Sequence, residues 1–391
     1  MHYTLHLTEQ CNMRCRYCYV SQSPAVMTAE TARAAVDLAL VNGGRRIGLV
    51  FFGGEPLLCR GLIQQTVAYA TERAHETGRD RMFYKITTNG LLLDGDFFDY
   101  AKEHDIFIAL SLDGIGEAHN AHRIAADGGP THRQVSAAAR QLLETRPYAP
   151  ALMTVNPDTV RYYRESVEYL YGLGFRYLIC SLNYAADWDK KALDELKRQY
   201  IKLAEFYYDR TVAEDKFYLS PFEVKISSHV HNKTYCHERC ELGQHQISVS
   251  AGGGLYPCVQ FVGDDRYRIG DVVHGIDEAA RLRLFRRNEE EKPGCDVCAI
   301  RARCNHYCAC LNKQATGSID QVSEVLCAHE RIILPIADRV AAKLYKKRVP
   351  MFIQKHYNDF YPLVSLAEDR AGAPEDSSSR INIGVRTPEE R

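Results

Sequence analysis

The chain has 391 residues, with 49 lysines and arginines against 50 aspartates and glutamates, so its formal net charge is -1. This balance excludes a protein held to nucleic acid mainly by a basic surface. Hydrophobic residues make up 46% of the chain, which excludes a disordered protein. We expect no membrane partner, because no apolar run reaches the ~18 residues that span a bilayer. The first residues do not form a secretory signal, so we expect a cytoplasmic location.

Strand-like and helix-like patterns alternate along the first half of the chain. Thr28 is expected to cap the first helix, and Gly43 to end it. The apolar runs predict strands at 3–7, 47–52, 82–87, 106–112, 151–155 and 177–182. Helical periodicity predicts the later helices at 62–75, 97–102, 135–143, 160–171 and 192–208. Six strand-then-helix units indicate a parallel sheet covered by helices, as either a partial barrel or a doubly wound sheet.

The composition changes after about residue 218. We predict a first domain at 1–218, a bridging region at 219–235, a cysteine-rich domain at 236–345 and an extension at 346–391. The cysteine-rich domain is expected to close with a helix at 332–344. From residue 368 the chain is rich in Ala, Gly, Pro, Ser and charge, so we expect this part of the extension to be mobile.

The fourteen cysteines are the unusual feature of the composition. Disulfides explain them poorly in a cytoplasmic protein, where clustered cysteines bind metal or do redox chemistry. Cys11, Cys15 and Cys18 form C-x3-C-x2-C directly after the first predicted strand. Three thiolates on one loop can hold an iron-sulfur cluster and leave one iron open to a ligand. A zinc site and a chance cluster are the alternatives.

The triplet, with Tyr17 before its last cysteine, resembles the signature of radical S-adenosylmethionine (SAM) enzymes. The resemblance continues through Gly53-Gly54-Glu55-Pro56, Thr88-Asn89-Gly90 and Ser111-Leu112-Asp113-Gly114, each at a predicted strand end. It implies a partial (β/α)6 TIM-like barrel of the α/β class. It also implies SAM as cofactor and a [4Fe-4S] cluster held by the three cysteines.

The resemblance also implies the residues that bind SAM. Gly53, Gly54 and Glu55 form the motif in which the Gly54 backbone meets the SAM amino group. Tyr17 would contact the adenine end, Ser111 and Arg123 would bind polar groups of SAM, and Leu182 would pack on the adenine. A turn at the glycines, a solvated Arg123 and a core position for Leu182 are the alternatives.

Seven later cysteines resemble the SPASM domain, an auxiliary cluster domain of peptide-modifying radical SAM enzymes, and Cys236 supplies an eighth. The resemblance implies two further [4Fe-4S] clusters, and therefore three clusters in total. The first would be held by Cys236, Cys240, Cys258 and Cys308, and the second by Cys295, Cys298, Cys304 and Cys327. Structural zinc sites are the alternative. Cys59, Cys180 and Cys310 lie outside both motifs, although Cys310 could compete with Cys308 as a ligand.

The reaction expected from these motifs is modification of a peptide. The chain resembles maturases of ribosomally made (RiPP) precursor peptides and, less closely, anaerobic sulfatase-maturing enzymes. The latter place a basic Asp after the cysteine of Tyr256-Pro257-Cys258, where this chain has Val259. Valine cannot accept a proton, so we expect thioether crosslinking at cysteine, with formylglycine formation as the alternative. A non-catalytic multi-cluster electron carrier or zinc module is the alternative of another class.

The expected partners follow from this resemblance. They are a precursor peptide and a low-potential electron donor such as flavodoxin or ferredoxin. The first predicted strand starts near Tyr3, which leaves no room for an N-terminal leader-binding domain. We therefore expect the precursor to be recognised by the barrel, the SPASM domain, the C-terminal tail or a separate leader-binding protein. No catalytic residue of the chain is assigned from the sequence.

Overall fold

The computed structural model describes residues 1–44, 46–79, 82–231 and 241–365. Two expected cluster ligands, Cys236 and Cys240, lie outside these residues. The part of the extension expected to be mobile, from residue 368, lies outside them as well.

One sheet organises the described residues, with strand order β7-β6-β5-β4-β3-β2-β1-β8-β9. All neighbours from β7 to β8 are parallel, and β8 and β9 are antiparallel. The strands are β1 (His2–Thr8), β2 (Gly48–Gly53), β3 (Phe83–Thr88), β4 (Ile106–Ser111), β5 (Pro150–Val155), β6 (Tyr177–Leu182), β7 (Tyr218–Leu219), β8 (Gln246–Val249) and β9 (Leu255–Tyr256). A separate antiparallel pair joins β10 (Gly270–Asp271) and β11 (Gly275–Ile276).

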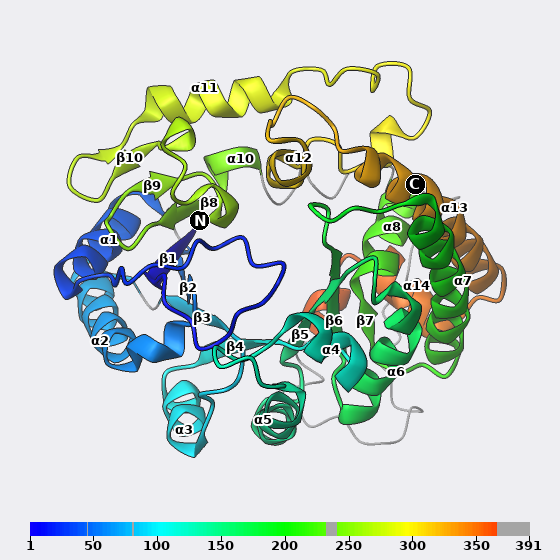
Figure 1. Cartoon of the computed structure of the whole chain (residues 1–391), viewed down its shortest axis with the longest axis horizontal. Coiled ribbons are helices and arrows are strands. Elements are labelled where there is room, and N and C mark those ends of the chain that lie inside the picture. Colours follow the sequence, from blue (N-terminus) through cyan, green and yellow to red (C-terminus); the bar gives the residue numbers. More distant parts are fainter. Residues whose placement is uncertain (45, 80–81, 232–240, 366–391) are drawn as a thin grey trace.

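Most helices of the first 212 residues lie outside the curve of this sheet (Figure 1). The helices are α1 (Ala29–Asn42), α2 (Arg60–Glu76), α3 (Gly95–Glu103), α4 (Gly116–His122), α5 (His132–Thr145), α6 (Tyr163–Leu173), α7 (Lys190–Val212), α8 (Ser220–His231), α10 (Glu241–Gln244), α11 (Glu278–Glu289), α12 (Ala309–Thr316), α13 (Glu324–Lys346) and α14 (Pro350–Tyr357). The sequence alone did not predict α4, which lies between β4 and α5.

The strand order decides between the two expected architectures. Strands β1 to β6 stand in chain order, whereas a doubly wound sheet would reverse direction at a switch point. The partial barrel is therefore confirmed. The expected cap of the first helix is also present, since the Thr28 hydroxyl oxygen accepts from the Thr31 N–H at 3.1 Å. Leu5 and Leu7 of β1 are fully buried in the core.

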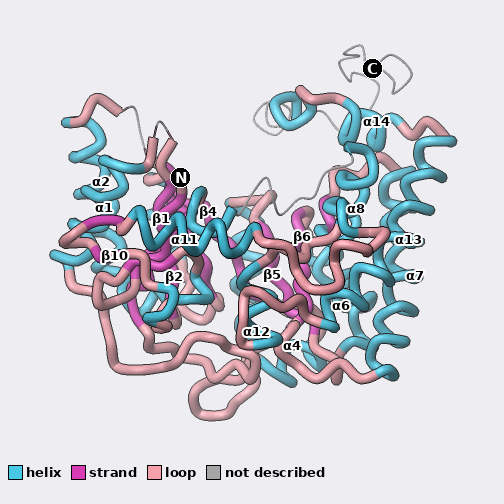
Figure 2. Tube along the Cα trace, turned by 90° about the horizontal axis from the view of Figure 1, so that it is seen from above, coloured by secondary structure: helices cyan, strands magenta, loops and turns pink. Residues whose placement is uncertain are grey.

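The cysteine-rich region spans both edges of the barrel sheet. At one edge β8 pairs with β1, with Thr4 opposite Ser248. At the other edge α13 packs against α7 and α8 (Figure 2). The intervening residues cross the open side of the curved sheet (Figure 1). The region expected as a second domain thus continues the sheet of the first and joins its two ends.

Candidate radical SAM site and auxiliary thiols

Cys11, Cys15 and Cys18 lie on the loop between β1 and α1, at the carboxyl end of β1. The end of α4 and the residues just after it hold this loop by their backbone. The Arg14 N–H donates to the Ile124 carbonyl at 2.8 Å, and the Arg16 N–H donates to the His122 carbonyl at 3.0 Å. The three thiols are therefore presented on a fixed loop at the strand ends, where parallel α/β proteins bind ligands.

The Gly-Gly-Glu segment at the end of β2 holds the other side of the cluster loop. The Gly54 N–H donates to the Thr8 carbonyl at 2.7 Å, and the Glu55 N–H donates to the Gln10 carbonyl at 2.9 Å. A Cβ atom on Gly54 would lie only 2.1 Å from the Gln10 carbonyl oxygen. Gly54 is therefore required by its close approach to the cluster loop.

Glu55 is 1% exposed, and its carboxylate faces protein donors. One oxygen accepts from the Thr88 hydroxyl at 2.7 Å, and the other accepts from the Asn89 N–H at 2.8 Å. Burial raises the pKa of Glu55 to about 7, although these hydrogen bonds act to lower it. Asn89 in turn donates to the Asn12 side chain at 2.7 Å. Glu55 thus connects the ends of β2 and β3 to the cluster loop.

Tyr17 and Arg123, two expected SAM contacts, meet at Asp113. The Tyr17 hydroxyl donates to Asp113 Oδ2 at 2.5 Å, and Arg123 Nε lies 2.9 Å from the same oxygen. The guanidinium also lies 5.3 Å from the centre of the Tyr17 ring. Arg123 is 7% exposed, so it is a buried partner of Asp113 and not a solvated surface residue.

Ser111 and Leu182 lie at the carboxyl ends of β4 and β6, Ser111 half-buried and Leu182 buried in the core. Gly53 ends β2 with a φ of +128°.

A cavity of about 460 Å³ opens beside the cluster loop, lined in part by Cys11, Asn12 and Arg14. A larger cavity of about 580 Å³ lies at the amino ends of β1 to β4, away from the thiols. Only the smaller cavity is next to the cluster loop.

The donor set suits the cofactors that the motifs imply. Three thiols from one loop match the three protein ligands of a cluster that keeps one iron open. Burial raises the pKa of Cys15 to about 11, while the nearby Arg123 charge favours its thiolate. Metal binding releases that proton, because only the thiolate binds iron.

The nearer auxiliary group consists of Cys258, Cys308 and Cys310 in the described residues. Cys258 follows β9 and is 4% exposed, and the other two thiols lie at the start of α12. The Sγ atoms of Cys308 and Cys310 lie 3.4 Å apart. A hydrogen bond from Cys310 lowers the pKa of Cys258. The structure therefore brings Cys310, which lies outside the motif, into contact with two expected ligands.

This group faces the cluster loop across Tyr19. Although 41% of Tyr19 is exposed, burial is the main factor that raises the pKa of its hydroxyl. The thiols of Cys258, Cys18 and Cys310, in that order, raise this pKa further. Tyr19 thus lies within electrostatic reach of both groups of thiols.

The farther auxiliary group gathers Cys295, Cys298, Cys304 and Cys327. Burial raises the pKa of Cys295, and the thiols of Cys327 and Cys298 raise it further. Cys327 similarly raises the pKa of Cys304, after burial and the Glu330 charge. No three His, Cys, Asp or Glu side chains of the described residues are close enough to hold one metal ion in common.

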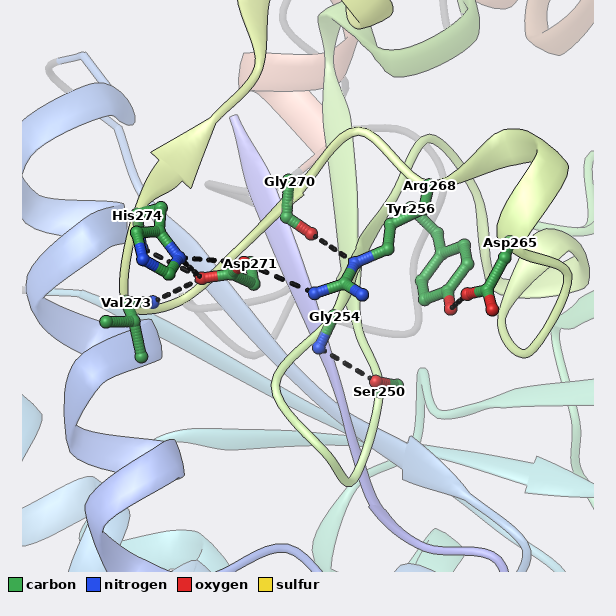
Figure 3. Close-up of polar contacts among 9 residues, drawn as sticks. All are labelled: Ser250, Gly254, Tyr256, Asp265, Arg268, Gly270, Asp271, Val273 and His274. Atoms are coloured by element: carbon green, nitrogen blue, oxygen red, sulfur yellow. Dashed lines mark hydrogen bonds and ion pairs between the residues drawn. The ribbon is translucent and has the colours of Figure 1, made fainter.

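The segment around Tyr256-Pro257-Cys258 is fixed by polar contacts (Figure 3). The Tyr256 hydroxyl donates to Asp265 Oδ1 at 3.2 Å, and the Gly254 N–H donates to the Ser250 hydroxyl at 2.9 Å. Further along, Arg268 donates to Asp271, whose carboxylate also binds the backbone of the following turn. Val259, half-buried, follows directly at the start of a short 3-10 helix.

A carboxylate near Val259 is already paired with cations. Asp264 lies 2.7 Å from Arg266 Nη2 and 3.1 Å from Lys313 Nζ. The hydrogen bond from Arg266, followed by that from Lys313, holds the pKa of Asp264 well below its usual range. Asp264 is therefore a poor substitute for the base that Val259 does not supply.

Sequence reasoning missed three residues that organise this region. Asp113 belongs to the Ser111-Leu112-Asp113-Gly114 motif, but its role depends on Tyr17 and Arg123, which lie outside that motif. His119 Nδ1 accepts from the Asp113 N–H at 3.3 Å. His329 on α13 lies 2.8 Å from the hydroxyls of both Tyr184 and Tyr200. An isolated histidine in a helical pattern carries no sequence signal for such contacts.

Within the described residues, no helix is both long and apolar enough to cross a bilayer.

Comparisons with known proteins agree with this geometry. A model of the radical SAM superfamily matches residues 5–183. The cysteine-type anaerobic sulfatase-maturating enzyme of Clostridium perfringens is 24% identical over 297 residues, covering 72% of this chain and 79% of the relative. The solved structure of native anSMEcpe with bound AdoMet and Cp18Cys peptide has a TM-score of 0.74 at 19% identity, over 88% of this chain and 99% of that chain.

A second solved structure is Streptococcus suis SuiB bound to precursor peptide SuiA, with a TM-score of 0.58 at 15% identity. The match covers 83% of this chain and 75% of that chain. At these identities the two structures show a shared fold. The family match, together with three thiols and three strand-end motifs in matching order, shows that residues 5–183 form a domain of the radical SAM superfamily, whose enzymes use a [4Fe-4S] cluster and SAM.

Proposed function

We propose that this chain is a peptide maturase that modifies a ribosomally made precursor peptide, with thioether crosslinking at cysteine as the reaction. When bound, the [4Fe-4S] cluster and SAM supply a 5′-deoxyadenosyl radical that removes a hydrogen atom from the substrate. Cys11, Cys15 and Cys18 hold the cluster. Asp113 orients Tyr17 and Arg123 beside the SAM position, and Gly54 presents its backbone there. Ser111 and Leu182 complete the binding surface.

The auxiliary thiols are proposed to hold two further [4Fe-4S] clusters, which makes three per chain. Cys258 and Cys308 belong to the nearer cluster, together with Cys236 and Cys240. Cys295, Cys298, Cys304 and Cys327 belong to the farther one. Because the thiols of both Cys18 and Cys258 raise the pKa of Tyr19, a peptide bound at Tyr19 would pass near both centres. A low-potential flavodoxin or ferredoxin would supply electrons, and a separate protein would present the leader of the peptide.

Peptide substrates are supported by the fold, since both anSMEcpe and SuiB have been solved with bound peptides. The observation that carries the choice of reaction is Val259. It stands where a formylglycine-forming enzyme needs a carboxylate, and the nearby Asp264 is paired with Arg266 and Lys313. Formylglycine formation remains the second candidate, because a sulfatase-maturating enzyme matches 72% of the chain.

The test is anaerobic incubation of the reconstituted protein with SAM, a reductant and a cysteine-containing precursor peptide encoded beside its gene. Thioether closure removes two hydrogen atoms and one alkylatable thiol per crosslink, which mass spectrometry before and after alkylation detects. A peptide that loses hydrogen but keeps all its thiols would contradict the crosslink. Conversion of a sulfatase peptide to formylglycine at a comparable rate would replace this proposal with the second candidate.

A matched variant isolates the role of Val259 in the choice of reaction. Val259→Asp introduces the carboxylate at the position expected of a formylglycine-forming enzyme. We expect this variant to lose crosslinking of the precursor peptide without losing SAM cleavage. Unchanged crosslinking in Val259→Asp would show that this position does not select the reaction.

A further inference from the structure

The cavity of about 580 Å³ at the amino ends of β1 to β4 has no part in the proposed function. Its volume lies within the range of small-molecule binding sites, about 300–1,000 Å³. Residues of β1 to β4 supply one part of its lining, and residues of α2 and of the turn from α3 to β4 supply the other. The cavity is therefore large enough to hold a ligand of its own.

Two phenyl rings and one lysine share the face of the sheet that lines this cavity. Phe83 and Lys85 are two residues apart on β3, and Phe107 of β4 is directly opposite Lys85. Side chains alternate between the two faces of a strand, so these three lie on the same face. Phe83 and Phe107 are 42% and 47% exposed, although phenylalanine is normally buried. The lining thus offers two partly exposed rings against which a planar group can pack.

Lys85 is a half-buried cation at the centre of this surface. Its Nζ atom lies 5.9 Å from the centre of the Phe107 ring. Among the residues that the structure describes, its ammonium group has no hydrogen bond and no ion pair. Burial lowers the pKa of Lys85, as expected for a charge that loses contact with water. An anionic group of a ligand would supply the acceptor that the ammonium group lacks.

Basic groups outnumber acidic groups in the lining of the cavity. The basic residues are His2, His75, Arg79, Lys85 and His104, and the acidic residues are Glu103 and Asp105. Both acidic side chains are largely exposed and have basic neighbours. Glu103 Oε1 lies 3.9 Å from His104 Nε2, and Asp105 Oδ1 lies 3.6 Å from Arg146 Nη1. The charge of the lining therefore favours an anion over a cation.

We propose that this cavity binds a small aromatic acid, a molecule with a planar ring and one phosphate or carboxylate group. Lys85 donates to the anionic group, and the ring packs against Phe83 and Phe107. The cavity lies at the amino ends of the strands, whereas Cys11, Cys15 and Cys18 follow a carboxyl end, so this ligand is distinct from SAM. The site needs no auxiliary cluster and no particular reaction, so it goes beyond the proposed function and does not depend on it.

Isothermal titration calorimetry tests the proposal on the anaerobically reconstituted full-length protein saturated with SAM. The probes are phenyl phosphate and benzoate, and inorganic phosphate and acetate are their counterparts without a ring. We expect one of the aromatic probes to bind about tenfold more tightly than its counterpart. Which of the two binds more tightly distinguishes a phosphate ligand from a carboxylate ligand.

Two variants separate the contributions of the charge and the ring. Lys85→Met keeps a long side chain without the ammonium group, and should raise the Kd of the aromatic probe about tenfold or more. Phe107→Leu should also raise this Kd, because the planar group loses a ring to pack against. Lys102→Met is the matched control, since Lys102 is exposed on α3 and lies outside the lining. Lys85→Met should cleave SAM at the parent rate, because Lys85 is far from the thiols along the strands.

Three results would overturn the inference. The first is that neither aromatic probe binds at millimolar concentration. The second is that Lys85→Met binds the aromatic probe as tightly as the parent does, which would show that the ammonium group is not part of the site. The third is an equal loss of affinity in Lys102→Met, which would indicate a general effect of charge. Circular dichroism and thermal unfolding verify that each variant is folded, and the partly exposed Phe107 allows Phe107→Leu to test the site even if Lys85→Met misfolds.

Discussion

The ammonium nitrogen of Lys225 lies 2.6 Å from Oε1 of Glu330, and the two side chains are only 4% and 0% exposed. Lys225 is on α8 and Glu330 is on α13, so this buried ion pair joins the bridging helix to the helix that ends the cysteine-rich region. Glu330 also accepts from the Asn305 N–H at 3.5 Å, next to the expected cluster ligand Cys304. The position of Cys304 therefore depends on a contact between segments about a hundred residues apart.

Removing one member of this pair should be strongly destabilising. Lys225→Met leaves the Glu330 charge buried and unpaired, which costs about 3–5 kcal/mol of unfolding free energy. Lys225→Met combined with Glu330→Leu removes both charges and should recover part of the loss. Chemical denaturation under anaerobic conditions measures both effects. Lys197→Met on the exposed face of α7 is the control, and a loss in the control equal to that in Lys225→Met would contradict the argument.

Gly54 offers a test of how the cluster loop is held. Gly54→Ala places a Cβ atom 2.1 Å from the Gln10 carbonyl oxygen, so the loop that carries Cys11 must shift. We expect the variant to fold but to lose about four irons after reconstitution, and to cleave SAM at less than a tenth of the parent rate. Iron analysis and detection of 5′-deoxyadenosine measure the two effects.

Gly61→Ala is the matched control for this substitution. Gly61 lies in the first turn of α2, and an added Cβ meets no atom within 4 Å. Alanine is preferred over glycine in a helix by about 0.5–1 kcal/mol, so Gly61→Ala should be equally active and slightly more stable. Full iron content in Gly54→Ala would show that the cluster loop does not require the close approach of this glycine.

The sheet could be predicted closely from the sequence, because its strands are short and largely buried, and β2, β3 and β4 each end at or shortly before a glycine. The predicted strand at 177–182 coincides with β6, and the other five differ from the observed bounds by no more than one residue at either end. The pairing of β8 with β1 could not be predicted, since β8 has only four residues and its partner is over two hundred residues away. Periodicity alone did not decide between a partial barrel and a doubly wound sheet. The resemblance to radical SAM enzymes predicted the partial barrel.

The sequence predicted which residues belong to the candidate site, but it did not predict the contacts between them. The motifs identified Tyr17, Arg123 and Glu55, but they gave no indication that Tyr17 and Arg123 share Asp113 or that Glu55 is buried among donors. Such contacts depend on how separate strand ends converge, which local sequence does not encode. Cys310 similarly lies outside both sequence motifs, and only the turn at the start of α12 brings its sulfur to within 3.4 Å of that of Cys308.

Cys327 should contribute more to stability than the cluster loop does. It lies in the first turn of α13, which Ser323 caps and which packs against α7 and α8. If it holds a cluster with Cys295, the cluster closes a loop of about thirty residues, and its loss removes folding free energy. We expect Cys327→Ala to lose about four irons and to lower the thermal midpoint more than the triple Cys11, Cys15 and Cys18→Ala variant does.

Two measurements decide this prediction. Differential scanning calorimetry of the anaerobically reconstituted variants compares their thermal midpoints, and iron analysis reports cluster loss. Cys180→Ala is the control, because Cys180 lies on β6 outside both motifs. A Cys327→Ala protein that unfolds at the parent temperature would show that Cys327 is not a structural ligand.

Buried His119 should make stability depend on pH. Its Nδ1 accepts from the Asp113 N–H, so Nε2 carries the proton and donates to the Thr131 hydroxyl oxygen, which lies 3.0 Å away. Burial lowers the pKa of His119 to about 3, although the Asp113 charge acts to raise it. Arg123 and His132, the other nearby basic groups, act to lower it further. The imidazole is therefore neutral in the folded protein at any pH near neutrality.

The direction of this pH dependence follows from how many protons the folded and unfolded states bind. Between a pKa of about 3 in the folded state and the ordinary value of 6.5, the unfolded chain binds the extra proton, so stability falls as pH falls. From pH 7.5 to 5.5 this group should remove ~1.4 kcal/mol of unfolding free energy. His119→Asn keeps an acceptor near the position of Nδ1 but cannot titrate. Between pH 7.5 and 5.5 the unfolding free energy of this variant should therefore fall by ~1.4 kcal/mol less than that of the parent. Urea unfolding at the two pH values measures the difference, with His75→Asn as an exposed control. An identical pH dependence in His119→Asn and the parent would show that His119 is already accessible to protons in the folded state.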